Sequence, residues 1–463
     1  MRSHLILALG GIAASVLAGC GDSPDARFVL NARTLALAPE AQEPVENALN
    51  DNFGTPTNLV AWLRLPVNYG GSEGTVERVE TDGPTDSFVA KIDGEVADPA
   101  IYPEFHWLSG AYAGNEQMPT LAHFDPETNV VSLIETLDPP PKPGDRFLIN
   151  AGKTLKDGRR LYMTHCVHCH GTSGDGNGPT AKYLNPLPRD YRLGTFKFTS
   201  TVRVGQPGDK VRRDDLARIV RNGIPGTYMP SFLLLGDDET VAVVEYVRWL
   251  AMRGELEHKL DADLEGDYTI QAVAERIEGK EDPKEIFANL ATLVPQTVAR
   301  ASKELDAAWQ AAENDKHVIR PTQKRHTVEQ DPDSIARGRA LFLSAKAKCA
   351  TCHGVTGRGD GPQTEAVQQG NDKPGLFDDW KHRVQPRDLT TGIFRGGRRP
   401  VDIYRRIRAG IKGTPMPPFG NDVLNDGEVW DLVNYVLYIP HLKGESIPAI
   451  TPEVQSDEKH ASN

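Results

Sequence analysis

The chain has 463 residues, a formal net charge of −12 and 25% charged residues. This length leaves room for several domains, and the lack of a sustained basic tract argues against nucleic acid as a partner. Residues 21–150 carry 21 acidic and 7 basic residues, whereas residues 151–253 carry 10 and 16. Residues 254–330 carry 16 and 10, and residues 331–442 carry 13 and 16. Acidic and basic segments therefore alternate, an asymmetry that can orient partners at encounter.

The first twenty residues combine a basic start with a short apolar run. Arg2 precedes the apolar stretch 5–17, which ends in Leu17-Ala-Gly-Cys20. The run is shorter than the roughly 18 apolar residues of a membrane-spanning helix. This segment, residues 1–19, resembles the signal peptide of bacterial lipoproteins. The resemblance implies a lipid on Cys20 and a periplasmic or other extracytoplasmic location, anchored to a membrane. An ordinary signal peptide followed by an unmodified cysteine is the alternative.

Residues 20–150 are expected to form an acidic N-terminal module of mixed or irregular structure, whose role the sequence leaves open. The apolar pattern favours an amphipathic helix over residues 41–52. Short strands are expected over residues 59–65, 75–80, 87–92 and 130–135. The proline-rich stretch 138–143 is typical of a stiff linker into the next domain.

The strongest signal in the chain is carried by two pentapeptides, Cys166-Val-His-Cys169-His170 and Cys349-Ala-Thr-Cys352-His353. Both have the C-x-x-C-H pattern by which c-type haem is attached. The two thiols lie one helical turn apart and can add to vinyl groups on one porphyrin edge, and the histidine can then bind the iron. Zinc is the competing interpretation. A zinc ribbon, however, places its second cysteine pair about 15–20 residues away, whereas these pairs start 183 positions apart.

The sequence around the pentapeptides is also repeated. Residues 170–179 and 353–362 share the pattern His-Gly-x-x-Gly-x-Gly-x-Gly-Pro. A Gly-Thr-x-Met-Pro segment follows in both halves and contains Met229 in the first and Met416 in the second. The chain therefore contains one haem-binding module twice.

Residues 153–253 and 333–442, here called the first and second repeat, resemble class I cytochromes c. In that family the C-x-x-C-H motif supplies the thioether bonds and one iron ligand, and a later methionine supplies the other ligand. The resemblance implies two covalently bound haems c, attached through Cys166, Cys169, Cys349 and Cys352. It also implies four axial ligands to iron, namely His170, Met229, His353 and Met416. The alternative for the two methionines is apolar filling of the core.

Residues around the haem are also implied by the resemblance. In the family, a proline carbonyl after the haem motif accepts a hydrogen bond from the ligand imidazole, and Pro179 and Pro362 match that position. A Pro-Arg-Asp triplet, present in both repeats, contains Arg189 and Arg387. These two arginines are candidates for pairing with haem propionates, or else ordinary surface residues.

The resemblance implies a mainly α fold with two helical cytochrome c domains in tandem, at residues 151–253 and 331–442. Closing helices are expected over residues 238–252 and 426–438. Each should cross an opening helix, which predicts aromatic pairs: Tyr162 with Tyr246 or Trp249, and Phe342 with Tyr435 or Tyr438. Residues 254–330 are expected to form a helical linker, with a helix over 284–313 that is interrupted near Pro295. Residues 443–463 form a polar tail.

Iron held by His and Met has no open site for a substrate, but it can exchange electrons through the porphyrin edge. The sequence therefore predicts an electron carrier of a respiratory chain, either a shuttle or a subunit of a larger redox complex. Its partners would be a quinol-oxidising complex, a terminal oxidase or another reductase. A dihaem peroxidase-type enzyme is the alternative, although one of its haems must lose a ligand. A thiosulfate dehydrogenase with a Cys-ligated haem would need a spare cysteine, and only Cys20 remains.

Overall fold

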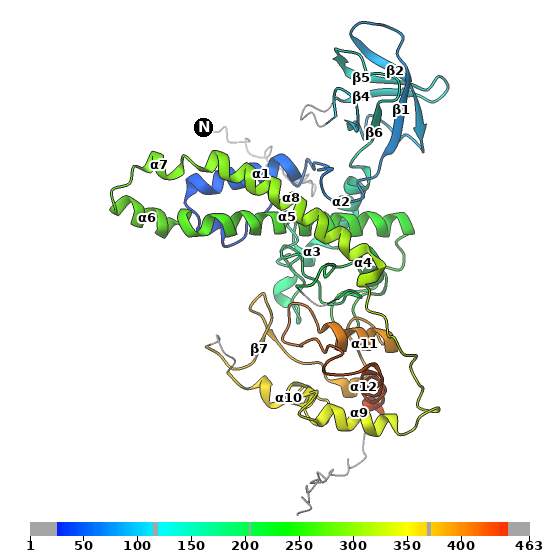
Figure 1. The fold of residues 1–463 in the computed structure, drawn as a ribbon, viewed down its shortest axis with the longest axis vertical. Coiled ribbons are helices and arrows are strands. Elements are labelled where there is room, and N and C mark those ends of the chain that lie inside the picture. The colour runs from blue at the N-terminus through cyan, green and yellow to red at the C-terminus, as the bar shows by residue number, and fades with distance from the viewer. Residues whose placement is uncertain (1–25, 114–118, 203–204, 368–371, 443–463) are drawn as a thin grey trace, which may run out of the picture. The chain divides into compact units, whose positions relative to one another are not determined.

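The computed structural model describes residues 26–113, 119–202, 205–367 and 372–442 (Figure 1). The expected signal segment with Cys20 and the tail from residue 443 lie outside this part of the chain. No helix in the described part is both long and apolar enough to span a membrane. The chain divides into two compact units. The first contains residues 1–63, 69–156 and 256–298, and the second contains residues 64–68, 157–255 and 299–463.

A six-stranded antiparallel sheet dominates the first unit (Figure 1). In chain order the strands are β1 Ser72–Arg78, β2 Thr85–Asp93, β3 Phe105–Trp107, β4 Leu121–Asp125, β5 Val130–Leu137 and β6 Arg146–Ile149. They are hydrogen-bonded in the order β3-β6-β1-β2-β5-β4. An antiparallel bridge joins Glu104, just before β3, to Thr120, just before β4. The sheet is therefore curled, and its two edges meet at this bridge.

The curled sheet encloses an aromatic core. Phe88, Phe105, Trp107 and Phe147 are buried, and neighbouring ring centroids among them lie 4.9–6.2 Å apart. Side chains alternate between the two faces of a strand, so each strand directs one set of residues inward. Aromatic side chains bury the largest areas of all residues. The sheet therefore has a hydrophobic core of its own, separate from the core of the haem repeats.

The expectation of a mainly α fold is wrong. Helices cover only 41% of the described residues, and the N-terminal region is mixed α/β. Three of the expected strands coincide with β1, β2 and β5, but residues 59–65 form no strand. The proline-rich stretch 138–143 connects β5 to β6 inside the sheet and is not a linker between domains. The pattern does not predict β3, β4 or β6 because strands of three to five residues show little period-two alternation.

Helices complete the first unit: α1 Pro39–Phe53, α6 Ile270–Glu278 and α7 Pro283–Phe287, with parts of α5 Asp237–Tyr268 and α8 Leu290–Glu313. The helix expected over residues 41–52 is confirmed as α1. The chain before α1 is attached to α5, since Asn31 Nδ2 and Thr34 Oγ1 each donate to an Asp261 oxygen at 2.7 Å. With 32 residues, α5 continues well beyond the expected closing helix.

The expected interruption of the linker helix near Pro295 is wrong. Pro295 lies inside α8, and the break falls at residues 288–289, between α7 and α8. Val294 and Leu305, on either side along the helix, are both buried. A helix stabilised by a packed apolar face can include a residue of poor propensity, because most helical stability in proteins comes from tertiary packing.

The second unit holds both haem repeats, with helices in the same order in each. The first repeat contains α2 Lys153–His165, α3 Val167–His170, α4 Arg213–Asn222 and the start of α5. The second contains α9 Ser334–Leu343, α10 Cys349–His353, α11 Pro400–Ala409 and α12 Asp426–Tyr438. A hairpin of β7 Leu376–Phe377 and β8 Arg383–Val384 belongs to the second repeat alone. The hairpin lies between Pro362 and the Pro-Arg-Asp triplet. This interval is 15 residues longer than the equivalent one after Pro179 in the first repeat.

In each repeat the opening and closing helices cross in backbone contact. A β-carbon on Gly158 of α2 would lie 2.1 Å from the carbonyl oxygen of Ala242 on α5. A β-carbon on Gly338 of α9 would lie 2.0 Å from that of Asp431 on α12. Both distances are shorter than any real carbon–oxygen contact, so only glycine allows the helices to approach this closely.

The predicted aromatic pairs across these crossings are confirmed. The ring centroids of Tyr162 and Tyr246 are 5.1 Å apart, and those of Phe342 and Tyr435 are 5.4 Å apart. All four side chains are almost fully buried. The two repeats therefore have equivalent helix pairs, and the opening helix of each pair ends shortly before a C-x-x-C-H motif.

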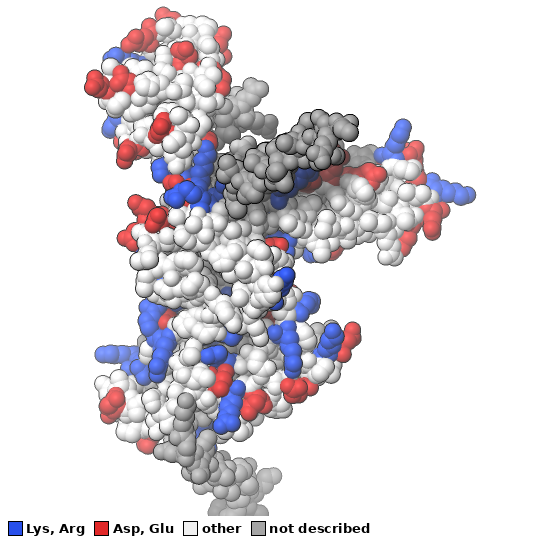
Figure 2. Space-filling model, turned by 180° about the vertical axis from the view of Figure 1, so that it is seen from behind, with Lys and Arg blue, Asp and Glu red and all other residues white. Residues whose placement is uncertain are grey.

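Surface charge differs between these regions. On the face drawn in Figure 2, Asp and Glu side chains are spread over the β-sheet module, whereas Lys and Arg side chains gather over the haem repeats. This agrees with the acidic balance of residues 21–150 and the basic balance of the repeats. The uneven charge is therefore a property of the folded surface as well as of the sequence.

Candidate haem-binding sites

The structure brings the predicted ligands of the first repeat to one cavity. Cys166 is the N-cap of the short helix α3, which ends at His170. Cys166, Cys169, His170 and Met229 all line a largely apolar cavity of about 190 Å³. Met229 is 59 residues beyond His170 in the sequence, so this meeting is a tertiary one. Two thiols, an imidazole and a thioether around an apolar space are the donor set that a covalently attached haem requires.

The four described cysteines of the two motifs are all free, and none of them forms a disulfide. Burial raises the pKa of Cys166 and of Cys349 to about 12, so both thiols are neutral at physiological pH.

His170 is oriented by a backbone carbonyl. Its Nδ1 lies 3.1 Å from the carbonyl oxygen of Arg189, and its ring stacks on Tyr191 with centroids 4.8 Å apart. Burial lowers the pKa of His170 to about 4, so the ring is neutral at physiological pH. A neutral imidazole that donates its Nδ1–H to this carbonyl keeps the Nε2 lone pair available for iron.

The prediction that the carbonyl of Pro179 accepts this hydrogen bond is wrong. Pro179 is exposed, and the Arg189 carbonyl takes its place. The physical reason is the path of the glycine-rich loop, residues 171–178, that follows His170. Gly176 has a φ of 75° and lies so close to the backbone that a β-carbon would be 2.8 Å from the carbonyl oxygen of Pro188. This contact holds the Pro-Arg-Asp triplet, and not Pro179, beside the imidazole.

The second repeat presents His353 in the same way, at the end of α10. Burial lowers the pKa of His353, and a backbone contact with Arg387 acts in the opposite direction. The buried Nδ1 makes no hydrogen bond of good geometry. Pro362 is exposed, at the start of a 3₁₀ turn, so Pro362 is again not the residue that contacts the imidazole. The backbone of Arg387 corresponds to that of Arg189.

Both methionine loops are closed by the same hydrogen bonds. In the first loop, Ile224 N donates to the Met229 carbonyl at 3.1 Å, and Thr227 Oγ1 donates to the Ile224 carbonyl at 2.8 Å. Thr227 Oγ1 also accepts from Met229 N at 3.2 Å. The equivalent three hydrogen bonds recur around Met416 and Thr414. The two threonines therefore position the methionines. The family resemblance does not imply this role, although both threonines recur in the Gly-Thr-x-Met-Pro pattern.

The two predicted propionate partners lie in different surroundings. Arg189 lines the cavity of the first repeat, and its guanidinium carbon lies 3.5 Å from the ring centroid of Trp380 in the β7–β8 turn. Arg387 Nε donates to the carbonyl of Ile393 at 3.0 Å. Pairing of either arginine with a haem carboxylate stays a prediction.

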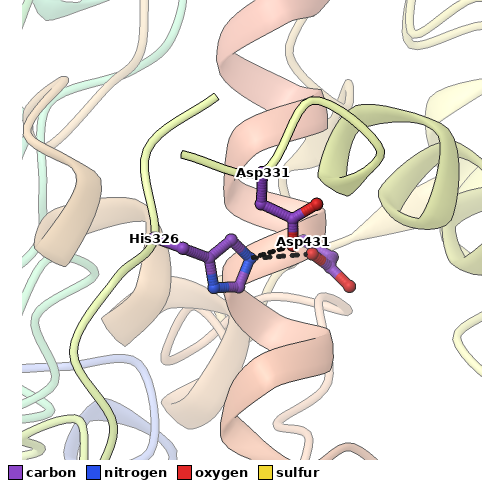
Figure 3. A group of neighbouring side chains, drawn as sticks. All are labelled: His326, Asp331 and Asp431. Atoms are coloured by element: carbon purple, nitrogen blue, oxygen red, sulfur yellow. Dashed lines mark hydrogen bonds and ion pairs between the residues drawn. The ribbon is translucent and has the colours of Figure 1, made fainter. Parts of the chain in front are cut away.

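One other cluster of metal-ligating residue types occurs in the described part of the chain: His326, Asp331 and Asp431 (Figure 3). Arg337 already binds both carboxylates, with Nη2 2.6 Å from Asp331 and Nε 2.8 Å from Asp431. Ser334 Oγ adds a hydrogen bond to Asp431 at 2.6 Å. A guanidinium supplies the positive charge here, so the cluster is an ion-pair network that attaches the segment before α9 to α12.

Comparison with known proteins supports the haem assignment. Residues 153–247 and 333–436 each match the family model described as cytochrome C oxidase, cbb3-type, subunit III. No curated protein matches the chain. A chain of the Kuenenia stuttgartiensis reducing HAO-like protein complex Kustc0457/Kustc0458 is 26% identical, covers 61% of this chain and 96% of its own length, and superposes with a TM-score of 0.40. The matched segments contain both C-x-x-C-H motifs, and both are similar to cytochrome c-type domains, which transfer electrons through a covalently bound haem c.

Proposed function

We propose that this protein is a dihaem cytochrome c that carries single electrons in a respiratory chain. It would act outside the cytoplasm, anchored to a membrane by a lipid on Cys20. It would serve as a shuttle or as a subunit of a larger redox complex. Its function would be electron transfer and not catalysis of a substrate reaction.

The observation that carries this proposal is the equivalence of the two methionine loops. The same three hydrogen bonds close the loop of Met229 and the loop of Met416. A methionine and a histidine on each iron leave no coordination site for peroxide or another small substrate. A dihaem peroxidase needs one haem whose distal ligand leaves, and neither loop differs from the other in the bonds that hold its methionine.

The residues around the first cavity suit electron exchange. Tyr228 and Leu187 line the cavity and are 64% and 43% exposed, so the cavity reaches the surface, where a partner can approach a porphyrin edge. Its other lining residues are mainly apolar. Bound haem supplies the one-electron chemistry. An apolar pocket and a methionine ligand both favour the less charged ferrous state, which raises the reduction potential.

Two further observations support the cellular setting. Both repeats are similar to subunit III of a cbb3-type cytochrome c oxidase, which favours a terminal oxidase or quinol-oxidising complex as a redox partner. The N-terminal Leu-Ala-Gly-Cys20 segment after an apolar run favours secretion and lipid attachment. Covalent attachment of haem c in bacteria also takes place outside the cytoplasm.

Two measurements test the proposal. Denaturing mass spectrometry of the mature protein should give the chain plus two haems, because four cysteines form two complete motifs. Stopped-flow spectra of the half-reduced protein mixed with peroxide should then show no rapid haem oxidation, and the reduced protein should bind carbon monoxide poorly. Noncovalent haem or stoichiometric zinc would refute the cytochrome assignment. Fast catalytic turnover of peroxide would establish the peroxidase alternative instead.

A further inference from the structure

The two repeats are packed against each other through charged side chains. Lys412, beside the second methionine loop, is buried and donates to Thr201 Oγ1 of the first repeat at 2.7 Å. Arg218 Nη1 of the first repeat donates to the carbonyl of Gly396 at 3.2 Å. All of these residues belong to the second compact unit. The contact between repeats is therefore part of one packed structure.

Four cations occupy equivalent places in the two repeats. Each Pro-Arg-Asp triplet is followed by Gly-x-Phe and a basic residue, in the pattern Pro-Arg-Asp-x-x-x-Gly-x-Phe-Lys/Arg. Arg189 and Lys197 are the basic residues of the first repeat, and Arg387 and Arg395 are those of the second. Lys197 and Arg395 therefore match each other as closely as the two triplet arginines do.

The cations of the first repeat reach the second. The Arg189 guanidinium stacks on Trp380, and Lys197 Nζ lies 3.3 Å from a carboxylate oxygen of Asp378. Trp380 and Asp378 lie in the turn between β7 and β8, which the first repeat lacks. Burial lowers the pKa of Lys197 to about 8, with further contributions from the charges of Arg189 and Arg395 against that of Asp378. Lys197 therefore lies close enough to Arg189 and to Arg395 to be affected by the charge of each.

The cations of the second repeat reach the first. Arg395 Nη2 lies 3.5 Å from the carbonyl oxygen of Gly226, in the loop that carries Met229. Arg387 Nη2 lies 3.0 Å from the position that a β-carbon on Gly226 would take. Arg395 also lines the same cavity as His170 and Met229. The cavity of the first repeat therefore includes one residue of the second.

Arg395 is partly buried at the edge of this cavity, and none of the described carboxylates pairs with it. Its Nε is buried and makes no hydrogen bond. Burial and then the charge of Arg387 lower the pKa of Arg395, and no carboxylate acts in the opposite direction. Of the acids that act on Arg189, Asp378 pairs with Lys197 and Asp190 pairs with Arg192 at 2.8 Å. A buried N–H group without an acceptor is costly, so the Nε–H of Arg395 is suited to an acceptor that is bound in the cavity.

A haem carries two carboxylates, and they are the only anionic groups that it brings into an otherwise apolar cavity. We infer that Arg395, from the second repeat, binds a carboxylate of the haem attached to Cys166 and Cys169, together with Lys197 and Arg189 of the first repeat. This rests on the proposed haem in the first repeat. The first haem site is thus completed by the second repeat, and Arg395 is a positioning residue that acts on a haem not attached to its own repeat.

The inference predicts which reduction potential Arg395 controls. A cation near an iron centre disfavours the ferric state, so its removal lowers the potential of the haem that it contacts. Arg395→Gln should therefore lower the potential of the first haem and leave that of the second unchanged. Potentiometric titration of the full-length holoprotein measures both. A Met416→His background identifies them, because imidazole in place of methionine moves the second haem to a distinctly lower potential.

Arg383→Gln is a matched control, because Arg383 is an exposed arginine of the same repeat that pairs with Glu365 at 3.3 Å. It should shift neither potential. Arg395→Lys keeps the charge but loses the two-point guanidinium contact. It should keep the first potential near that of the wild type while changing the resonance Raman bending mode of a haem carboxylate. This variant also provides a readout if Arg395→Gln fails to fold.

A shift confined to the second haem, or equal shifts of both haems, would overturn the inference. An unchanged carboxylate mode in Arg395→Lys would overturn it as well. Failure of this inference can be told apart from failure of the proposed function, which requires two covalently bound haems. That failure would appear earlier, as a wild-type mass without covalent haem.

Discussion

At the scale of single residues, the ligands alone do not define the sites. The Arg189 carbonyl orients His170, and Thr227 and Thr414 hold the methionine loops. Each threonine hydroxyl both donates and accepts a hydrogen bond, so it connects the start of its loop to the methionine. The strength with which a methionine stays on iron should therefore depend on a residue that never contacts the haem iron.

Thr227→Val removes this hydroxyl with little change in volume. Each lost hydrogen bond costs about 1 kcal/mol, so the Met229 loop should open more readily. The hydroxyl makes two such bonds, so about 2 kcal/mol is lost. Carbon monoxide, which competes with Met229 for the reduced iron, should then bind the first haem about thirtyfold more tightly, since about 1.4 kcal/mol corresponds to tenfold. Thr414→Val should do the same for the second haem only, so each variant controls the other. Carbon monoxide titration of the reduced proteins measures this, and equal effects on both haems would contradict the assigned role.

At the scale of secondary-structure elements, the helix crossings at Gly158 and Gly338 fix where each haem motif begins. The crossing of α2 with α5, and of α9 with α12, leaves no room for a β-carbon. The four aromatic residues next to these glycines then pack between the helices. Each C-x-x-C-H motif begins within a few residues of the end of a helix whose position is set by this contact.

Gly158→Ala should therefore destabilise the protein. Its β-carbon would lie 2.1 Å from the Ala242 carbonyl oxygen, and overpacking of this kind costs about 1–3 kcal/mol. Gly266→Ala is a matched control, because Gly266 is a helical residue of α5 with nothing within 4 Å of an added β-carbon. That change should stabilise the helix by about 0.5–1 kcal/mol. Urea unfolding of the holoproteins compares them, and equal stabilities would show that the α2–α5 contact is less close than described.

The ion-pair network of Asp431 makes the attachment of α12 sensitive to acid. Burial alone would raise the pKa of Asp431, but hydrogen bonds from Arg337, Ser334 and His326 outweigh it and lower the pKa below 3.8. A carboxyl group whose pKa is lowered by folding stabilises the protein above its unfolded pKa. That contribution is lost as the pH falls through the lowered, folded value.

Asp431→Asn should remove this contribution. The variant leaves Arg337 paired with Asp331 alone. Because the Arg337 side chain is about half exposed, loss of the Asp431 charge should cost about 1–2 kcal/mol near neutral pH. The difference from the wild type should begin to shrink below about pH 3.8, where Asp431 is protonated in the unfolded chain, and should vanish once the pH falls through the lower, folded pKa. Glu365→Gln, at an exposed ion pair, should cost less than about 1 kcal/mol at any pH. Urea unfolding at pH 7 and pH 3 tests this, and a difference that does not change with pH would exclude the ionic contribution.

At the scale of the whole molecule, the chain joins a curled β-sheet module to two haem repeats, and the expected lipid attachment precedes both. The sheet module has its own core and carries no haem motif. The repeats share an interface of charged side chains within one compact unit. Two haem sites packed in this way would give the molecule two fixed stations for an electron.

Cys20→Ser tests the membrane attachment. Without the thiol no lipid can be added, so the protein should accumulate as an uncleaved precursor or as a soluble periplasmic form. Metabolic labelling with a fatty acid should mark the wild type and not the variant. Fractionation after a salt wash provides the second measurement. A labelled variant would show that another residue carries the lipid, whereas an unlabelled variant that stays in the membrane fraction would indicate attachment through a partner.

The sequence by itself determined the haem motifs, the duplication and the helix pairs of the repeats. Covalent attachment and iron ligation require particular residue types at short, fixed spacings, so His170 and Cys169 could be recognised without a structure. The closing helix over residues 426–438 coincides with α12 because amphipathic periodicity is a local property. The aromatic pairs followed from these helices once the family resemblance supplied their crossing.

Only the tertiary structure decided how the strands pair and which residues surround the predicted iron ligands. Strand β6 pairs with β1 and β3, which lie far from it in the sequence, and no local pattern specifies such partners. The sequence predicted the Pro179 carbonyl as the acceptor for the imidazole, whereas the path of the loop after His170 places the Arg189 carbonyl there. Arg395 lines a cavity whose other lining residues lie more than a hundred residues before it in the sequence. Its position depends on how two folded repeats pack, because distant side chains meet only after each repeat has its own core.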